Sequence, residues 1–390
     1  MSTTYHLLSE SEPFSEHKGG AVSRWAANVL RFDPDAIILA PSSDSSWGFD
    51  PARIKNLPGL IRHKRLIKLG GHYLPWVIRF RMLRSILLPA LATLTSGDTV
   101  WVHGRPEFAA ALEPFVHARG AQLMLHLHNS HLVQWSTRVT SVIKADCYVF
   151  VSQYLREEAL AKFPSLGRTA VLVNGADPLL FYPATQRKQA DAVPTVLFAS
   201  RLVPDKGLHI FIDAMRKLAE DGVRLNGVVV GGAGFGGSAP TPYVLDMQSR
   251  APANVRFEPY CTGRALAEWF RNSDIFCLPS CWNDPFPLAP LEAMASGVPV
   301  VATSSGGIPE QLAHGGGLLV ARNSVPELAD ALARLAASPE LRRELGSKGL
   351  ASFRKNFTWE TVRGAYYAIL EPPPTALDIR LMELTEMRRA

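Results

Sequence analysis

Two acidic residues, Asp284 and Glu292, lie in the segment Pro279–Glu310, whose pattern is strand, loop, helix, strand and glycine-rich loop. We expect the helix to run from Leu288 to Ser296, so that Glu292 lies about one turn inside it, at about 1.5 Å of rise per residue. Both carboxylates can then face a ligand at the helix N-terminus, where free N–H groups suit a diphosphate. A solvated acidic loop with a structural glutamate explains the spacing equally well.

Two cations follow the strand predicted at Thr195–Ser200. Arg201 ends this strand, and Lys206 stands at the start of a helix after a short loop. In doubly wound sheets, ligands bind at the carboxyl ends of the strands. Arginine binds phosphate oxygens through a bidentate fork, and lysine acts as a point charge. A surface ion pair between Lys206 and Asp205 is the alternative.

Adjacent glycines, Gly19 and Gly20, follow the first predicted strand and precede a helical pattern that begins at Val22. Glycine lets the backbone approach a phosphate closely. A plain turn is the other interpretation, and the residues alone do not separate the two.

Histidines end the strand predicted at Gln122–His128. His126 and His128 point to the same face because side chains alternate along a strand, and Asn129 follows them. A lone histidine is more often structural than functional. Three further polar residues follow the preceding strand, and we expect either a site or a cap and turn there: His103, Arg105 and Glu107.

Runs of β-branched residues alternate with helical patterns along the chain. This alternation predicts parallel sheets covered by helices, an α/β fold, which would position these residues. The alternation stops in the polar, proline-containing stretch 178–194 and then restarts. We predict one Rossmann-like domain over 1–177, a linker over 178–194, and a second over 195–371, with a cleft between them. The predicted strands are Tyr5–Leu8, Ala36–Ala40, Thr99–His103, Gln122–His128, Cys147–Val151, Ala170–Val173, Thr195–Ser200, Gly227–Val230, Val255–Glu258, Ile275–Leu278, Val298–Ala302 and Leu318–Val320.

Three motifs together resemble the family-4 retaining glycosyltransferases of the GT-B fold, densely over about residues 170–320. They are Asn174-Gly-Ala-Asp177, Ser200-Arg201-Leu-Val-Pro-Asp-Lys206-Gly, and Asp284-x7-Glu292-Ala-Met-Ala-x-Gly-x-Pro-Val. The resemblance implies two doubly wound domains facing a cleft, with the acceptor on the first domain and a nucleotide sugar on the second. It also implies that the segment 372–390 returns to the first domain.

The resemblance assigns roles to the residues above. Arg201 and Lys206 would bind the donor diphosphate, Glu292 the ribose hydroxyls, and Asp284 the donor sugar. The full donor-binding set is then Gly19, Gly20, Arg201, Lys206, Asp284, Phe286, Leu288, Ala289 and Glu292. The catalytic pair is His128 and Asp284, and the acceptor side comprises His103, Arg105, Glu107, His126 and Asn129.

Two departures from the family pattern affect the donor site. Asp284 replaces the usual glutamate and is one methylene shorter. Pro287 stands where glycine is usual and has no N–H, so the amides of Leu288 and Ala289 must hold the diphosphate.

Two other motifs predict competing functions, and their context argues against both. Gly232–Gly237 satisfies G-x-G-x-x-G, but Pro240 and Pro242 follow it, whereas a dinucleotide site needs a helix that begins within the glycines. Asp33-Pro34-Asp35 has the metal-binding D-x-D spacing, but it precedes a strand and is better explained as a turn. We expect no metal cofactor.

The net charge of +6 is local. The stretch 51–97 contains no acidic residue and nine basic ones, some at i+3 spacing among apolar residues. Basic amphipathic helices lie on anionic membranes, and the resemblance favours that partner over a solvated helical face. No nucleic-acid-binding module accompanies the charge, so we expect no nucleic acid partner. The predicted membrane patch comprises Arg62, Lys64, Arg65, Lys68, Arg81 and Arg84.

Composition and termini indicate the compartment. The chain is 47% hydrophobic and 19% charged, which excludes intrinsic disorder, and its four cysteines lack C-x-x-C spacing and suit reduced, buried thiols. The N-terminus has no basic region followed by an apolar one, and no run suits a membrane span. We expect a cytoplasmic protein, peripheral on the inner face of the plasma membrane where the basic patch binds lipid.

The sequence therefore predicts a hexosyltransferase that transfers a sugar from a UDP- or GDP-sugar, with retention, to a saccharide or lipid-linked saccharide in polysaccharide or lipopolysaccharide biosynthesis. A catalytically silent nucleotide- or saccharide-binding protein of the same fold is the first alternative, motivated by Asp284 and Pro287. A sugar-nucleotide epimerase of that fold is the second.

Overall fold

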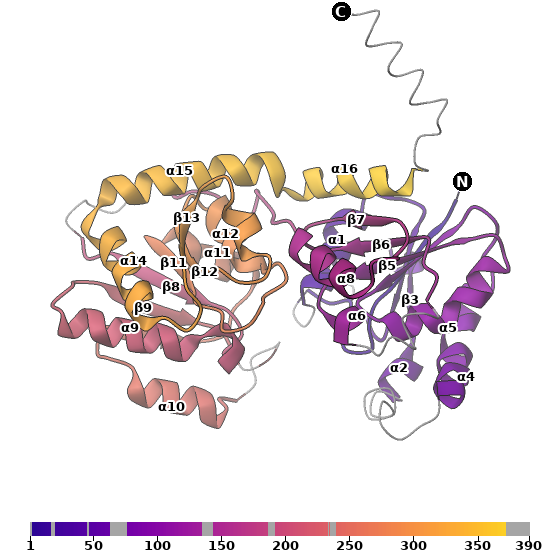
Figure 1. The fold of residues 1–390 in the computed structure, drawn as a ribbon, viewed down its shortest axis with the longest axis horizontal. Helices are drawn as coiled ribbons and strands as arrows, with labels where there is room; N and C mark the ends of the chain where they lie inside the picture. Colours follow the sequence, from indigo (N-terminus) through magenta and orange to yellow (C-terminus); the bar gives the residue numbers. More distant parts are fainter. Residues whose placement is uncertain are drawn as a thin grey trace, which may run out of the picture.

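The computed structural model of the chain has two α/β domains, each built on one parallel sheet, lying side by side along the long axis (Figure 1). It describes residues 2–16, 20–44, 47–62, 76–134, 143–185, 192–232, 234 and 239–371. The predicted α/β class with two Rossmann-like domains is confirmed, because each sheet is parallel and its strands alternate along the chain with helices.

In the described residues of the first domain, seven parallel strands form a sheet in the order β3-β2-β1-β4-β5-β6-β7. They are β1 (Thr4–Leu7), β2 (Ala36–Ala40), β3 (Ile54–Asn56), β4 (Thr99–His103), β5 (Gln122–Leu127), β6 (Cys147–Phe150) and β7 (Thr169–Val171). The central strands are almost entirely buried, as expected where helices cover both faces of a parallel sheet. β3 is the strand that the sequence patterns did not predict.

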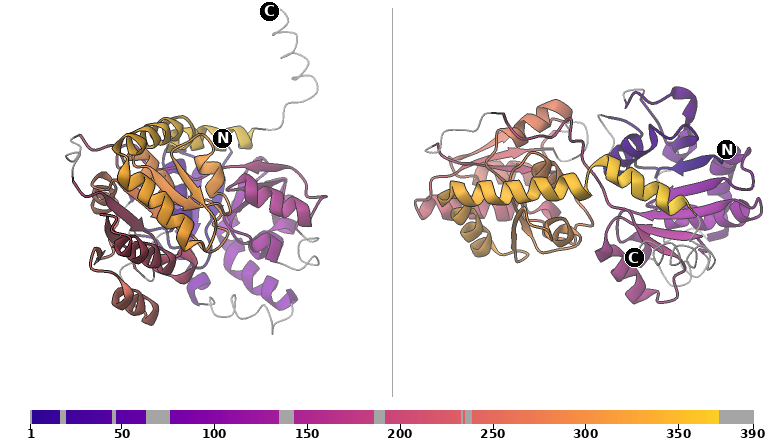
Figure 2. Two further views of the ribbon diagram at one scale, coloured as in Figure 1. Left: turned by 60° about the vertical axis from the view of Figure 1, so that its left-hand side comes forward. Right: turned by 90° about the horizontal axis from the view of Figure 1, so that it is seen from above.

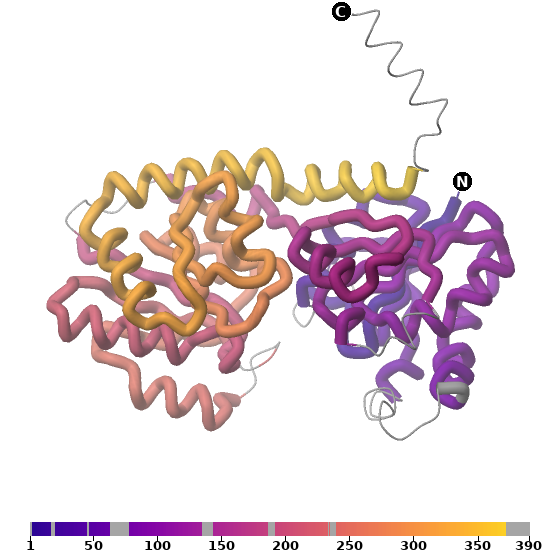
Figure 3. Tube along the Cα trace, in the orientation of Figure 1, coloured from indigo at the N-terminus to yellow at the C-terminus, as the bar shows by residue number. Residues whose placement is uncertain are grey.

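The helices of the first domain follow the strands in sequence. They are α1 (Ala21–Leu30), η2 (Pro51–Arg53), α2 (Pro58–Arg62), α4 (Trp76–Leu87), η3 (Leu88–Leu91), α5 (Pro106–His117), α6 (His131–Gln134) and α8 (Gln153–Lys162). The tube trace shows how these helices surround the sheet (Figure 3).

The second domain has, within its described residues, six parallel strands in the order β10-β9-β8-β11-β12-β13. They are β8 (Thr195–Ala199), β9 (Asn226–Val230), β10 (Val255–Glu258), β11 (Ile275–Leu278), β12 (Val300–Thr303) and β13 (Gly317–Val320). The helices are η4 (Pro204–Lys206), α9 (Leu208–Glu220), α10 (Pro242–Arg250), α11 (Gly263–Arg271), α12 (Leu288–Ala295), α13 (Ile308–Leu312), α14 (Val325–Ala337) and α15 (Pro339–Asn356), and α16 (Trp359–Leu370) follows them in sequence. The sheet order reverses direction between β8 and β11, which is where such sheets bind ligands.

The last helix, α16, differs from the predicted domain limits. We placed residues up to 371 in the second domain, but α16 packs against α1 of the first domain (Figures 1 and 2). Its apolar stripe of Trp359, Val362, Tyr366 and Ile369 joins the buried cluster that contains Trp25 and Trp101. The chain changes domain at Thr358, whose hydroxyl caps α16 by accepting from the Thr361 N–H at 3.2 Å.

The remaining predicted limits stay predictions. The first domain, 1–177, and the linker, 178–194, are described only in part, because residues 186–191 lie outside the described ranges. The segment 372–390, expected to return to the first domain, also lies outside them.

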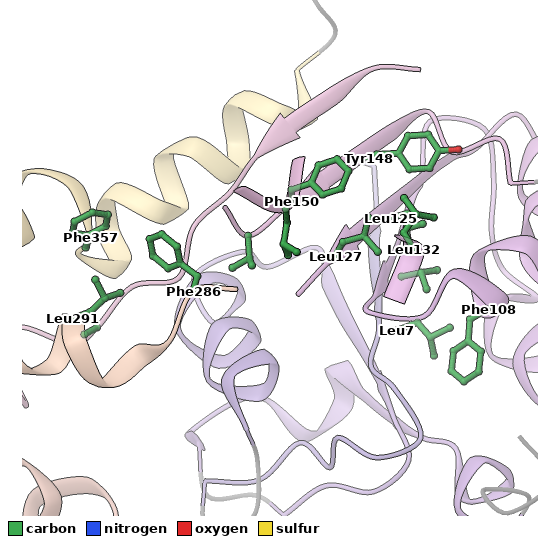
Figure 4. Packing of buried hydrophobic residues seen from close by; sticks show 14 of the residues in the cluster. Leu7, Phe108, Leu125, Leu127, Leu132, Tyr148, Phe150, Phe286, Leu291 and Phe357 are labelled. Carbon is green, nitrogen blue, oxygen red and sulfur yellow. The ribbon is translucent and has the colours of Figure 1, made fainter. Parts of the chain in front are cut away.

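A continuous apolar cluster joins the two domains near the strand ends. Phe286 and Leu291 of the second domain pack close to Phe357, and Phe150 and Leu127 of the first domain belong to the same cluster (Figure 4). The ring centroids of Phe286 and Phe357 are 6.0 Å apart. This contact fixes the loop before α12 on the end of α15, and the cluster continues from there into the first domain.

None of the helices in the described ranges has the length and the apolar character that crossing a lipid bilayer would require.

Candidate active site

A pocket of about 430 Å³ lies between the two domains, at the carboxyl ends of their strands. Most of its lining comes from the second domain, and the first domain contributes α1 and the end of β5. The predicted site residues that line it are Gly20, His128, Asn129, Arg201, Lys206, Asp284, Phe286, Leu288, Ala289 and Glu292. Gly19, also predicted here, lies outside the described residues.

The N-terminus of α12 opens into this pocket. Pro287 is its N-cap and supplies no side-chain hydrogen bond, and Pro290 in the first turn also lacks an N–H. The backbone donors of the first turn are therefore those of Leu288 and Ala289, which both line the pocket. The helix spans eight residues, so its end carries a partial positive charge toward a bound anion.

Two side-chain amides hold the loop before α12 in place. Asn174 of the first domain donates to the Phe286 carbonyl at 2.8 Å. Gln311 donates to the Pro287 carbonyl at 2.7 Å. Both amides are buried, so this loop is fixed from both domains before any ligand binds.

Lys206 and Asp284 form a buried ion pair in the pocket wall. Ser280 donates to the same carboxylate at 3.3 Å. The Lys206 ammonium also lies 5.4 Å from the centroid of the Trp282 ring. A cation placed this way can exchange its protein carboxylate for a diphosphate, because both partners are anionic oxygens.

Close backbone packing brings Lys206 to this position. Gly207, with φ at +76°, ends the short helix η4, and a Cβ there would lie 1.8 Å from the Pro279 carbonyl oxygen. Only glycine allows this approach between the loop after β8 and the loop after β11.

Glu292 is paired across the cleft. Its Oε1 accepts from Arg24 Nη1 of α1 at 3.0 Å, and its side chain is 6% exposed. Burial raises the pKa of Glu292 above its ordinary value, and Arg24 opposes that shift. Arg24 therefore pairs with the carboxylate that is expected to accept hydrogen bonds from ribose hydroxyls.

Glu12 occupies the N-terminus of α1. Its Oε1 accepts from the N–H groups of Gly20 at 2.7 Å and Ser23 at 3.1 Å. Burial raises the pKa of Glu12, against the opposing effect of these two backbone donors. The predicted phosphate-binding amide of Gly20 is thus already bonded to a carboxylate, which a phosphate would have to displace. The sequence analysis missed both Glu12 and Arg24.

The predicted histidines form one group in which His103 and His126 are buried and His128 is half-buried, and only His128 of them lines the pocket. His128 Nε2 lies 3.2 Å from His103 Nδ1, whose Nε2 is 3.2 Å from His6 Nδ1. Burial lowers the pKa of His128 and of His6 to about 3, and that of His103 well below its ordinary value. These imidazoles are neutral at pH 7, so His128 can accept or donate one hydrogen bond but carries no charge.

His126 and His128 share one face of the sheet, as predicted, and their ring centroids are 4.0 Å apart. His126 is fully buried between Trp25, His103 and Trp101. The expectation that His103 and His126 meet an acceptor directly is not supported by this placement, because both lie in the layer behind His128.

Arg105 and Glu107 belong to a separate buried network. Arg105 forms ion pairs with Glu10 and, at 3.6 Å, with Glu107. Burial raises the pKa of Glu107, which the nearby Arg105 opposes. Neither residue lines the pocket. The structure thus places the predicted acceptor-side pair next to the cleft, in contact with each other.

The two motifs that we argued against are explained by the structure. The helix after the Gly232 loop begins only at Pro242, after Pro240, whereas a dinucleotide site needs a helix that begins within the glycines. Asp33 Oδ1 accepts from the Asp35 N–H at 3.0 Å, so this pair forms a turn.

Of the predicted basic patch, the structure describes Arg62, Arg81 and Arg84. Lys64, Arg65 and Lys68 lie outside the described residues. Arg62 on α2 and Arg81 on α4 are exposed. Arg84 instead donates to the Ala111 carbonyl at 2.8 Å and helps to fix α4 on α5. Other cations of the stretch serve the fold too: Arg53 donates to three carbonyls, those of Leu30, Asp33 and Ala36, and Lys55 to that of Ala90.

Comparison with known proteins gives a consistent result. Residues 184–351 match the sequence model of the family described as "Glycosyl transferases group 1". The chain is 26% identical over 404 residues to the GDP-mannose-dependent monoacylated alpha-(1-6)-phosphatidylinositol monomannoside mannosyltransferase of Corynebacterium glutamicum, covering 96% of this chain and 100% of that protein. It is 34% identical over 212 residues to the D-inositol 3-phosphate glycosyltransferase of Streptomyces bingchenggensis, a match that spans 50% of this chain and 46% of that protein.

Among solved structures, the Anabaena HepE protein in complex with UDP and glucose is similar in fold. The TM-score is 0.71 at 19% identity, with 95% of this chain and 99% of that chain covered. The chain has the two-domain GT-B fold, and its residues 184–351 match the group 1 glycosyl transferases. Its second domain is the part that carries the match to the group 1 family.

Proposed function

We propose that the protein transfers a sugar from a nucleoside diphosphate sugar to a saccharide or lipid-linked saccharide, with retention at the anomeric carbon. The observation that carries the proposal is the convergence of Arg201, Lys206, Glu292 and the α12 N-terminus on one pocket between the domains. The relatives support it, since one is named for GDP-mannose and a structural neighbour was solved with UDP and glucose.

Donor binding is an exchange of ionic partners. The diphosphate takes the place of Asp284 at Lys206 and gains Arg201 and the amides of Leu288 and Ala289. The ribose hydroxyls take the place of Arg24 at Glu292. Lys206 keeps an anionic partner in this exchange, and the Glu292 carboxylate keeps hydrogen-bond donors.

Catalysis in this scheme rests on positive charge at the leaving diphosphate. Arg201, Lys206 and the helix terminus stabilise the negative charge that builds on it as the sugar leaves. In other transferases a metal ion stabilises this negative charge. Because these groups do so here, we propose that transfer needs no metal. Released from Lys206, Asp284 contacts the donor sugar, and neutral His128 contacts the sugar from the first domain.

The acceptor side faces a membrane in this proposal. Ile61 on α2 and Ile78 on α4 are 50% and 51% exposed, unusual for isoleucine, and each is close in sequence to an exposed arginine, Arg62 or Arg81. Apolar and cationic side chains together are what an anionic lipid surface binds. We propose a cytoplasmic enzyme, peripheral on the plasma membrane, that acts in polysaccharide or lipopolysaccharide synthesis.

Liposome binding tests the membrane part. Arg62→Glu/Arg81→Glu should reduce sedimentation with vesicles of phosphatidylglycerol and phosphatidylcholine, while Arg343→Glu on the exposed face of α15 should not. Equal binding of both variants would show that the cations form an ordinary solvated face.

Product analysis tests the transfer part. The protein is incubated with UDP-glucose, GDP-mannose or ADP-glucose and a lipid-linked oligosaccharide, and the products are examined by NMR. A new glycosidic bond with the donor's anomeric configuration supports the proposal. An altered nucleotide sugar formed without acceptor indicates an epimerase, and nucleotide binding without turnover indicates a silent binding protein.

A further inference from the structure

Three histidines of the first domain converge in a way that sugar transfer does not require. His103 ends β4, and His126 and His128 lie on β5 and just after it. β4 and β5 are paired with His103 directly opposite His126. One ring nitrogen from each of the three lies within 4.8 Å of the other two.

The separation of two of these nitrogens suits a metal ion. Tetrahedral zinc with Zn–N bonds of about 2.0–2.1 Å holds its ligand nitrogens about 3.3–3.4 Å apart. His103 Nδ1 and His128 Nε2 are 3.2 Å apart. If the rings turn slightly outward and the bridging proton moves to the other nitrogen of its own ring, both of these nitrogens can bind a metal ion.

His126 supplies the independent indication that a ligand is missing. Its side chain is fully buried, and no partner among the described residues meets hydrogen-bond geometry for either ring nitrogen, although the Leu172 backbone lies nearby. Buried polar groups are nearly always satisfied by protein, water or an ion. A metal ion between His126 and its two neighbours would satisfy it.

Outer contacts already orient one of the ligands. His6 Nδ1 lies 3.2 Å from His103 Nε2, and His6 Nε2 lies 3.1 Å from Tyr366 Oη of α16. With Nε2 held by His6, the ring of His103 presents Nδ1 to His128. Metal-binding histidines usually have the second nitrogen fixed in this manner.

The donor set selects the kind of ion. Three neutral imidazoles without a carboxylate or thiolate suit zinc and other late first-row divalent ions, and do not suit magnesium or calcium. The three histidines supply three ligands, which leaves a fourth position for water, and His128 connects the group to the pocket that it lines. The cleft is also the route by which the ion would enter.

We propose that His103, His126 and His128 bind one Zn²⁺ ion and that bound zinc inhibits sugar transfer. Inhibition follows because the ion fixes the ring of His128 and places a positive charge beside it, where the donor sugar would otherwise meet a neutral imidazole. This second part rests on the proposed function, whereas zinc binding itself does not.

Binding is tested on chelator-treated full-length protein titrated with Co²⁺ or Zn²⁺ alone. Wild type and His314→Ala, which removes an exposed histidine elsewhere, should each bind one equivalent and give the visible absorption of tetrahedral Co²⁺. His126→Asn and His128→Asn should each weaken binding at least 100-fold. Absence of binding by folded wild-type protein at 1 mM metal would overturn the proposal, as would unchanged affinity in both variants.

Turnover measured with and without zinc tests the second part. Inhibition at the metal concentration that saturates Co²⁺ or Zn²⁺ binding, reversed by EDTA, supports it. Zinc binding with unchanged turnover would overturn the inhibition. If the metal-free protein has no transferase activity with any donor, the proposed function fails while the binding result stands.

Discussion

Gly306 gives a sharp test of how the donor loop is built. It follows β12 with φ at +57°, and a Cβ placed on it would lie 2.1 Å from the Asp284 carbonyl oxygen and 2.7 Å from the Asp284 nitrogen. That carbonyl accepts a hydrogen bond from the Gly307 N–H at 2.9 Å. Gly306→Ala therefore pushes directly on the backbone of a residue in the donor pocket.

The size of the effect follows from the contact. Cβ atoms essentially never approach other atoms closer than 3.0 Å, so the 2.1 Å contact must open by about 0.9 Å. A misplacement of about 1 Å in a site can cost about 100-fold in rate, or about 2.7 kcal/mol of transition-state stabilisation. The positive φ adds about 1–2 kcal/mol of destabilisation to the folded state.

Gly222 supplies a matched control. It follows α9 with φ at +74°, and a Cβ there has no atom within 4 Å among the described residues. Gly222→Ala therefore suffers the backbone strain without the collision. We expect both variants to lose stability in urea, Gly306→Ala the more because of the collision. Only Gly306→Ala should lose about 100-fold in kcat/KM for the best nucleotide sugar, measured by release of the nucleoside diphosphate. Equal kcat/KM values for the two variants would refute the proposed loop packing.

Three further predictions concern the cleft and the domain contacts. Burial raises the pKa of Glu292 above 4.5, so over a range of pH the folded protein keeps a proton that the unfolded chain has lost. The free energy of unfolding of wild type relative to Glu292→Gln should therefore fall as pH rises from 4.5 through the raised pKa. A rise in urea unfolding experiments would contradict this. Glu310 accepts hydrogen bonds from the Gln153 and Tyr154 N–H groups at the start of α8, across the domain boundary. Glu310→Ala should therefore lower the free energy of unfolding by about 1–2 kcal/mol and increase the radius of gyration in X-ray scattering. Ser324→Ala, which removes a cap within one domain, should leave the scattering unchanged, and equal scattering of both variants would argue against the interdomain role of Glu310. Trp359→Ala should lower the free energy of unfolding by about 3–5 kcal/mol in urea. The control Tyr367→Ala, at a 38% exposed position of the same helix, should lose far less. Similar losses in the two variants would mean that α16 does not pack on the first domain.

The sequence predicted the strands well because parallel sheets need apolar runs. Every predicted strand corresponds to one in the structure, usually within a residue or two at its ends. β3 was missed because three residues, Ile54–Asn56, give no pattern of their own within a basic stretch. The pocket residues Arg201, Lys206, Asp284 and Glu292 were predicted as a set because family motifs mark local loops that the fold brings together.

Contacts between distant segments were not predictable. Arg24 and Glu292 are 268 positions apart, and Glu310 and Gln153 are 157 apart, so no spacing in the sequence joins them. The pattern of α16 predicts a helix with one apolar face, but the pattern does not show which domain that face packs against. The same limit applies to the histidines. The alternation of side chains along a strand predicted that His126 and His128 share one face, but it could not show that His126 lies behind His128.

The central claim is that this cleft binds a nucleoside diphosphate sugar through cations of the second domain. Lys206→Met tests it most directly, with Lys217→Met, an exposed lysine of α9, as the control. With both variants folded by circular dichroism, the account predicts that Lys206→Met lowers kcat by about 100- to 1,000-fold for the best donor, while Lys217→Met changes it little. Turnover by Lys206→Met within tenfold of the control would contradict the account.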